Sequence, residues 1–161
     1  MSELSIRRAV SEDYAVIGRL LEDILKQHQN CRPDLFEAQA GGLGKYTPEE
    51  FSELLADEST VIFTACLNEQ VVGYLICKIL TVRKNPVLKN IKTLYLDDLC
   101  VDAKYRHIGA GKALMNAAEE YARENGFYNI TLNVWEFNDN AKAFYEHLGY
   151  GTQRREMEKI L

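Results

Sequence analysis

The sequence predicts an α+β fold with a mixed, mostly antiparallel sheet, one parallel strand pair and about four flanking helices. Two β-rich runs, Thr60–Leu67 and Val71–Leu80, are separated by a short polar turn, which indicates an antiparallel hairpin. A strand that ends at Val101, a helix and a second strand at Ile130–Trp135 follow with the spacing of a right-handed parallel crossover. Because no break in composition divides the chain, we expect one domain over residues 1–161.

The N-terminal elements are read from their apolar period and their capping residues. Leu4–Val10 has the composition of a first strand. Ser11 is expected to cap a helix that ends near Gln29, because acidic residues follow the cap and apolar residues recur at helical spacing. Asn30–Tyr46 has no clear period, and its glycines predict a mobile loop. Thr47-Pro48-Glu49-Glu50 then starts a short helix with a cap, an N-terminal proline and acids in the first turn.

The C-terminal half contains further turn and helix signals. Asn85-Pro86 marks a turn before the strand that ends at Val101. The helix that follows carries an apolar face and is expected to stop near Gly126. Asn138–Leu148 is predicted to be the last helix, and Thr152–Leu161 a closing strand.

Composition indicates which class of protein the chain belongs to and in which cellular compartment it is expected. With 47% hydrophobic and 27% charged residues, the chain has an ordinary globular composition, and its net charge of −5 argues against nucleic acid as a partner. The four cysteines form no Cys-x-x-Cys pair, which favours free thiols in a reducing compartment; they are Cys31, Cys66, Cys77 and Cys100. The N-terminus has no apolar core of a signal peptide and no run has transmembrane length, so we expect a cytoplasmic protein with no membrane partner.

A strand, a glycine turn and a helix start make the most informative stretch. Leu94–Val101 is a largely apolar run that suits a strand covered on both faces. Gly109 and Gly111 let backbone N–H groups approach a ligand closely, and a helix start adds unpaired N–H groups and the positive end of its dipole. Basic residues cluster at the same place: Lys104, Arg106, His107 and Lys112. This combination predicts a phosphate-bearing ligand.

The glycine spacing narrows the ligand further. It differs from Gly-x-x-x-x-Gly-Lys-Ser/Thr, which excludes a P-loop, and it lacks the third glycine of a dinucleotide fingerprint. Arg106-x-x-Gly109-x-Gly111 after an apolar strand resembles the acetyl-CoA pyrophosphate loop of the GNAT (GCN5-related N-acetyltransferase) superfamily. A second motif, Asn138-x-x-Ala141 followed by Phe144-Tyr145 and Gly149-Tyr150, resembles the family's C-terminal signature. The resemblance covers residues 61–150 well and the N-terminal part loosely.

The resemblance implies acetyl-CoA as co-substrate and no metal. The loop amides from Arg106 to Lys112 would hold the pyrophosphate, and the strand edge at Leu99–Val101 would pair with the pantetheine arm, with the Leu99 N–H on the thioester carbonyl. The expected cofactor-binding residues are Leu99, Cys100, Val101, Arg106, His107, Ile108, Gly109, Ala110, Gly111, Lys112, Asn138, Ala141 and Tyr145. A metal site at His28-x-x-Cys31 lacks a second ligand pair.

The resemblance also implies two catalytic residues. Tyr145 matches the position that many members use as general acid toward the CoA sulfur, although a core aromatic on a packed helical face is the other interpretation. Tyr95-Leu96-Asp97-Asp98 resembles the Tyr-Leu-Glu-Asp segment of spermidine/spermine (diamine) N-acetyltransferases, which implies that Asp97 helps to activate the amine. Its shorter side chain would act through a water or attract a cation. Without a bulge only one of the two aspartates faces the substrate, and a salt bridge is the simpler interpretation of Asp98.

We therefore expect an N-acetyltransferase that transfers the acetyl group of acetyl-CoA to a primary amine of a small cationic acceptor. The alternatives are acetylation of protein N-termini or lysines, and an acyl-CoA-binding module without catalysis. The variable segments 26–58 and 83–90 are expected to read the acceptor. The expected partners are a small-molecule amine and a second copy in a homodimer, and no nucleic acid.

Overall fold

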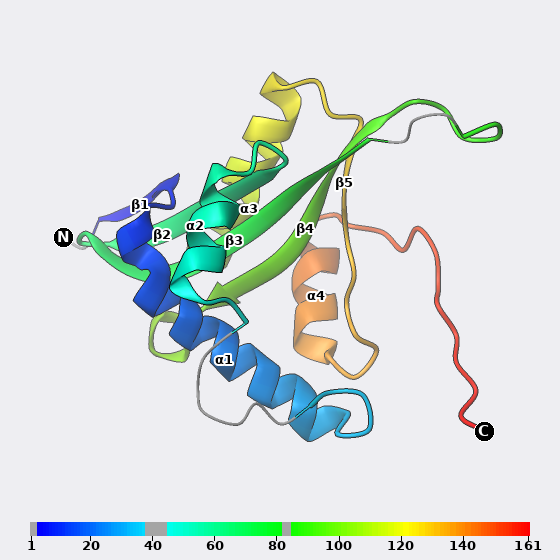
Figure 1. Cartoon of the computed structure of the whole chain (residues 1–161), viewed down its shortest axis with the longest axis horizontal. Helices are drawn as coiled ribbons and strands as arrows, with labels where there is room; N and C mark the ends of the chain where they lie inside the picture. Colours follow the sequence, from blue (N-terminus) through cyan, green and yellow to red (C-terminus); the bar gives the residue numbers. More distant parts are fainter. Residues whose placement is uncertain (1–2, 38–44, 82–84) are drawn as a thin grey trace.

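The computed structural model describes residues 3–37, 45–81 and 85–161, and these form a five-stranded sheet in the order β1-β2-β3-β4-β5 (Figure 1). The strands are β1 Leu4–Arg8, β2 Thr60–Leu67, β3 Gln70–Thr81, β4 Lys92–Val101 and β5 Asn129–Leu132. Neighbours are antiparallel except β4 and β5, which are parallel. The predicted mixed sheet with one parallel pair is confirmed. The glycines of the predicted 30–46 loop lie outside the described residues.

Helices cover both faces of the sheet (Figure 1). Helices α1 (Tyr14–Cys31) and α2 (Pro48–Ala56) pack on one face around Tyr74 and Ile76 of β3. Helix α3 (Ala110–Glu124) packs on the other face, where α4 (Asp139–His147) also contacts the core. These four α-helices of the described residues match the predicted number.

Local signals explain most element boundaries. Thr47 caps α2 in a capping box, with its hydroxyl accepting from the Glu50 N–H at 3.2 Å and the Glu50 carboxylate accepting from the Thr47 N–H at 2.8 Å. Asn68 and Glu69 have φ values of 48° and 70°, the left-handed pair that a tight two-residue hairpin needs. Gly126, with φ of 70°, follows the end of α3.

The start of α1 differs from the prediction, because Ser11 does not cap it. Residues Ser11–Asp13 form a 3₁₀ turn and α1 begins at Tyr14. The reason is Asp13, a buried carboxylate that accepts from the Val10 N–H at 2.9 Å and from the Arg7 guanidinium at 2.7 Å. These two contacts fix the strand-to-helix junction two residues later than the sequence indicated.

The predicted closing strand at Thr152–Leu161 is wrong. This segment runs away from the body of the molecule (Figure 1) and forms no ladder with the strands of the described residues. Every one of its residues is exposed, including Met157 and Ile160. An ion pair between Glu158 and Arg32 joins it to the segment after α1. The charged residues that alternate with its few apolar ones leave it no continuous face to bury.

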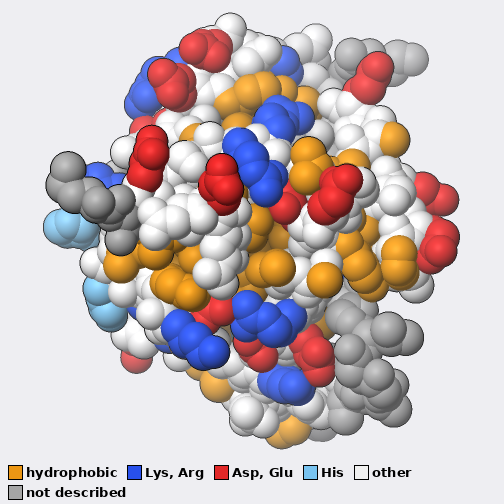
Figure 2. Space-filling view, turned by 90° about the vertical axis from the view of Figure 1, so that its left-hand side faces the viewer, with side chains coloured by type: hydrophobic (Ala, Val, Ile, Leu, Met, Phe, Trp, Pro, Cys, Tyr) orange, Lys and Arg blue, Asp and Glu red, His pale blue; other side chains and the backbone are white. Residues whose placement is uncertain are grey.

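Three further features concern the surface charges, the cysteines and the helices. On the face seen in Figure 2, acidic and basic side chains are interspersed among apolar ones. All four cysteines are free; Cys66 and Cys77 are buried, whereas Cys31 is exposed. Among the described residues, no helix is long and apolar enough to cross a membrane.

Candidate active site

A β-bulge in β4 shapes the site. Ile76 pairs with Asp98 and Cys77 pairs with Leu96, so Asp97 is an extra residue without a partner in β3. The bulge suspends the alternation that would send Asp97 and Asp98 to opposite faces. Both carboxylates therefore approach one ammonium: the Lys45 Nζ lies 2.9 Å from Asp98 Oδ2 and 3.6 Å from Asp97 Oδ2.

The bulge also separates β4 from β5. The parallel pairing runs from Thr93 opposite Asn129 to Leu96 opposite Leu132, and it ends there. On its other side β4 stays paired with β3 as far as Val101. Among the described residues, the β5-side edge of β4 from Asp97 to Val101 thus has no strand partner, and its backbone can pair with an extended ligand. This shortening also explains why β5 ends at Leu132 rather than at Trp135 as predicted.

The acidic pair lies in a partly desolvated environment. The Asp98 side chain is only 16% exposed, and burial raises its pKa above the ordinary value even though the Lys45 ammonium pulls the other way. For Lys45, burial lowers the pKa, but the hydrogen bond and charge of Asp98 outweigh burial, so the net pKa is raised. Lys45 is therefore held as a cation between two carboxylates.

Tyr145 approaches this region from α4. Its ring packs edge-on against Phe144 and Tyr150, with centroids 5.2 Å and 6.0 Å away. Burial, followed by the negative charge of Asp98, raises the pKa of Tyr145 to about 12. The phenol therefore keeps its proton at neutral pH and can donate it. Packing and proton donation, the two alternatives in the sequence, are compatible in this geometry.

The glycine loop joins β4 to α3. A 3₁₀ turn, Ala103–Tyr105, is followed by an exposed loop in which His107 has φ of 66° and Gly109 has φ of 87°. Gly109 is the N-cap of α3, so the first N–H groups of that helix have no partner within it. The predicted residues Arg106, Ile108 and Lys112 are exposed, while Ala110 is buried in the core.

The second glycine of the motif has a different role. A Cβ atom on Gly111 would lie 3.3 Å from the Phe144 ring, which is closer than ordinary van der Waals contact. Gly111 thus allows the first turn of α3 to approach α4. The same α4 begins at its N-cap Asn138, whose Oδ1 accepts from the Ala141 N–H at 3.1 Å. Asn138 and Ala141 belong to the same sequence motif, and this hydrogen bond connects them in the structure.

Sequence reasoning missed Asp102, which holds the glycine loop against α1. Its side chain caps the 3₁₀ turn by accepting from the Lys104 N–H at 3.0 Å, and it pairs with Arg19 of α1 at 2.7 Å. The residue is 7% exposed. Asp102 follows the apolar strand directly, a position typical of a cap, but its partner Arg19 is far away in the sequence and cannot be inferred from spacing.

Replacement of Asp102 by alanine is expected to destabilise the fold by about 1–3 kcal/mol, because a buried acceptor of two hydrogen bonds is lost. The Lys104 N–H and then Arg19 lower the pKa of Asp102. This stabilisation is therefore present above the unfolded-state pKa and is lost as the pH falls through the lower folded-state pKa. Urea unfolding at neutral and acidic pH measures the difference. Asp139→Ala, which removes a carboxylate that is 90% exposed, should change nothing measurable.

Four aromatic side chains form a cluster beside the acidic pair: His28, Phe36, Trp135 and Phe137. Trp135 and Phe137 are stacked, with centroids 5.8 Å apart and planes at 12°. Burial lowers the pKa of His28, with a smaller opposing effect from Asp98. Trp135 is 41% exposed, so the cluster presents an aromatic surface. The cluster ties the end of α1 to the chain that leaves β5.

The remaining predicted residues have simpler surroundings. Leu99 and Val101 pack against the α3-side core, and Cys100 against the α1-side core. Burial raises the pKa of Cys100 to about 12, so its thiol is uncharged at neutral pH. No group of three side chains that could hold a metal ion occurs among the described residues, and His28-x-x-Cys31 gains no further ligands there.

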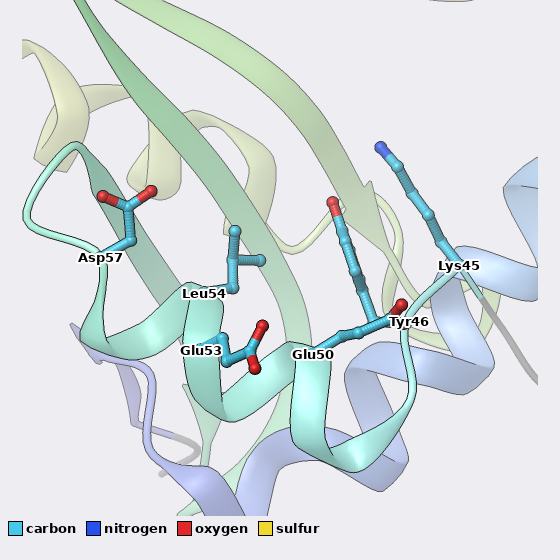
Figure 3. A pocket seen from close by; sticks show the side chains of 6 residues that line it. All are labelled: Lys45, Tyr46, Glu50, Glu53, Leu54 and Asp57. Carbon is cyan, nitrogen blue, oxygen red and sulfur yellow. The ribbon is translucent and has the colours of Figure 1, made fainter.

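A groove of about 590 Å³ lies along α2 (Figure 3). Lys45 and Tyr46 form one end of it, and both side chains point toward the sheet (Figure 3). The other lining residues are Glu50, Glu53, Leu54 and Asp57. Lys45 therefore borders both this groove and the carboxylates of β4.

Comparison with known proteins places this arrangement in a family. Residues 20–150 match the model of the acetyltransferase (GNAT) family. An uncharacterised N-acetyltransferase, YhfO of Bacillus subtilis, is 29% identical over 150 residues, which cover 91% of this chain and 89% of the relative.

Solved structures agree with the fold. A point mutant of the BH1408 protein from Bacillus halodurans superposes with a TM-score of 0.91 at 30% identity, covering 98% of this chain and 99% of that one. An aminoglycoside acetyltransferase from an uncultured soil sample, solved with sisomicin, has a TM-score of 0.69 at 21% identity over 98% and 96% of the two chains. At this identity the second likeness concerns the fold alone.

Proposed function

Because the chain belongs to the acetyltransferase (GNAT) family, we propose that it transfers the acetyl group of acetyl-CoA to the primary amine of a small cationic acceptor. The observation that carries this proposal is the ammonium already bound at the bulge. Lys45 Nζ lies within 4 Å of both Asp97 and Asp98, so these carboxylates have the spacing and charge to hold a primary ammonium.

The described residues fit acetyl-CoA in two places. The exposed N–H groups at the start of α3, with Arg106 and Lys112 beside them, would hold the pyrophosphate. The unpaired edge of β4 from Leu99 to Val101 would hydrogen-bond the pantetheine arm, and the Leu99 N–H would polarise the thioester carbonyl. When bound, acetyl-CoA supplies the activated acetyl group; the protein supplies position and proton transfer.

The acidic pair would bind the acceptor and prepare it for reaction. An alkyl ammonium has an ordinary pKa near 10.4, so it must lose a proton before its nitrogen can attack. Asp98, whose pKa is raised by burial and which lies nearer to the Lys45 ammonium, would accept the proton, and Asp97 would add charge that attracts a cation. This assignment gives proton acceptance to Asp98 and leaves Asp97, the residue expected to activate the amine, the attraction of the cation.

Transfer then needs one bond made and one broken. The ammonium first gives one proton to the carboxylate pair or to water. Its nitrogen then attacks the acetyl carbonyl carbon, the carbon–sulfur bond breaks, and the nitrogen gives its second proton back to Tyr145 once that residue has protonated the sulfur. Tyr145 would donate its phenolic proton to the departing sulfur, because its pKa of about 12 keeps that proton in place at neutral pH. An acceptor must displace Lys45 from Asp98, and the groove along α2 has room for the displaced side chain.

Replacing Asp97 or Asp98 by asparagine, which removes its charge, tests which class of amine the protein acetylates. With diamines, monoamines, amino-terminal peptides and lysine peptides as acceptors, we expect the highest kcat/KM for diamines. Asp97→Asn should raise KM for diamines by about tenfold with little change in kcat, as expected when an attractive charge is lost. Asp98→Asn should lower kcat and remove its acidic pH limb. Steady-state assays of thiol release measure both parameters.

Glu53→Gln is the matched control for this test, because it removes a carboxylate from the groove that Lys45 also lines without touching the bulge. If both aspartate variants keep wild-type kcat and KM for every amine, the acidic pair has no part in acceptor binding. Preference for a peptide over all diamines would instead favour acetylation of proteins. Acetyl-CoA binding without turnover of any amine would favour a module that only binds acyl-CoA.

A further inference from the structure

Lys45 occupies the position that the proposed function gives to the acceptor amine. Resting on that function, we propose that Lys45 is itself an acetyl acceptor: its ε-amine is acetylated by the same chain, and this modification frees Asp97 and Asp98 for an external amine. The ammonium lies 2.9 Å from Asp98 and 3.6 Å from Asp97, and the side chain is 37% exposed. A nucleophile held in place reacts with the advantage of an intramolecular reaction.

The backbone next to Lys45 is fixed by contacts with α1 and α2. Tyr46, the next residue, accepts at its carbonyl oxygen a hydrogen bond of 2.9 Å from the Tyr14 hydroxyl of α1. Thr47, one residue further, is the cap of α2. The Lys45 ammonium also lies 5.5 Å from the centroid of the Tyr46 ring. These contacts hold the side chain over β4 instead of leaving it free in solvent.

Two other lysines form ion pairs away from the bulge. Lys26 contacts Glu22 one turn away on α1, and Lys142 contacts Asp139 on α4. Among the described residues, Lys45 alone forms ion pairs with the carboxylates of the bulge. An acetylation reaction that needs these carboxylates therefore selects Lys45, whereas nonspecific chemical acetylation has no reason to do so.

The reaction conserves atoms and charge. The Lys45 ammonium gives one proton to Asp98 or to water, and its nitrogen bonds to the acetyl carbonyl carbon. The carbon–sulfur bond breaks and Tyr145 protonates the sulfur to give CoA thiol. The nitrogen then gives its second proton to the Tyr145 phenolate, which restores the phenol. The product is a neutral amide, which cannot form an ion pair with Asp98. Because that ion pair raises the pKa of Lys45, the neutral amine is scarce, and we expect a single slow turnover.

The test is to incubate the full chain with acetyl-CoA without an amine, and to follow the intact mass and the modified peptide. We expect one acetyl group per chain, at Lys45, with a rate that does not depend on protein concentration. Lys45→Arg keeps the positive charge and should remain unmodified, whereas Lys26→Arg should match the wild type. Tyr145→Phe should slow the modification.

A parallel reaction with an excess of a diamine separates this inference from the proposed function. Acetylated diamine together with unmodified Lys45 in both reactions would overturn the inference and leave the proposed function standing. If neither the diamine nor Lys45 is acetylated, both are contradicted. An acetylation rate proportional to protein concentration, or acetyl groups spread equally over exposed lysines, would also overturn the inference.

Discussion

Replacement of Gly109 by aspartate is expected to abolish acetyl-CoA binding while the fold remains intact. Gly109 is the exposed N-cap of α3, and an added Cβ would meet nothing within 4 Å, so a side chain there meets no clash, and its cost is the backbone strain at φ of 87°. Its carboxylate would lie where the pyrophosphate is proposed to bind. At an effective dielectric constant of about 20, two unit charges about 5 Å apart repel by about 3 kcal/mol. This corresponds to a loss of more than about 100-fold in affinity, measurable by calorimetry.

The control for this variant is Gly126→Asp, at the other end of the same helix. Gly126 also has a left-handed backbone, with φ of 70° against 87° for Gly109, and it also has no atom within 4 Å of an added Cβ. Both variants therefore carry the same new charge and a similar backbone strain. Unchanged acetyl-CoA affinity in Gly109→Asp, or an equal loss in Gly126→Asp, would contradict the assignment of the glycine loop as the phosphate site.

Tyr145→Phe is expected to lower kcat about 100-fold or more, the usual scale for loss of a general acid, with little change in stability. The substitution removes one hydroxyl and keeps the ring contacts with Phe144 and Tyr150. Because the pKa of Tyr145 is raised to about 12, wild-type kcat should show no alkaline limb from this group below about pH 10. Steady-state kinetics across pH and thermal unfolding give the two readouts.

Tyr150→Phe is the matched control, because it removes a hydroxyl from the ring that packs on Tyr145 while leaving the proposed donor in place. We expect its kcat to match the wild type. A wild-type kcat in Tyr145→Phe would leave this residue as a packing aromatic only. An equal fall in both variants would indicate that the packing of α4, rather than a proton, had been changed.

Local signals in the sequence predicted most of the fold. The capping box at Thr47–Glu50 and the left-handed hairpin turn at Asn68-Glu69 are each determined by a few neighbouring residues. The crossover between β4 and β5 follows from the right-handed rule for parallel pairs, and the glycine pattern after an apolar strand is enough to place the loop at the start of α3. These features need no information from distant parts of the chain.

The features that the sequence did not reveal depend on distant contacts. The bulge at Asp97 is a register shift between β3 and β4 at Ile76 and Cys77. No residue type in β4 predicts it. Asp102 depends on Arg19, and the position of Lys45 depends on the fold of α1 and α2. The composition of residues 152–161 predicts a strand, but a strand also needs a partner, and no strand of the described sheet pairs with this segment.

Amine-dependent release of CoA from acetyl-CoA, with the acetylated amine quantified in the same sample, tests the proposed activity most directly. We predict that a diamine accelerates thiol release and that acetyl-diamine and CoA appear in equal amounts. Asp98→Asn and Tyr145→Phe should reduce both products in parallel. Thiol release that is independent of every amine and peptide offered, or release without an acetylated product, would contradict the assignment of this chain as an amine acetyltransferase.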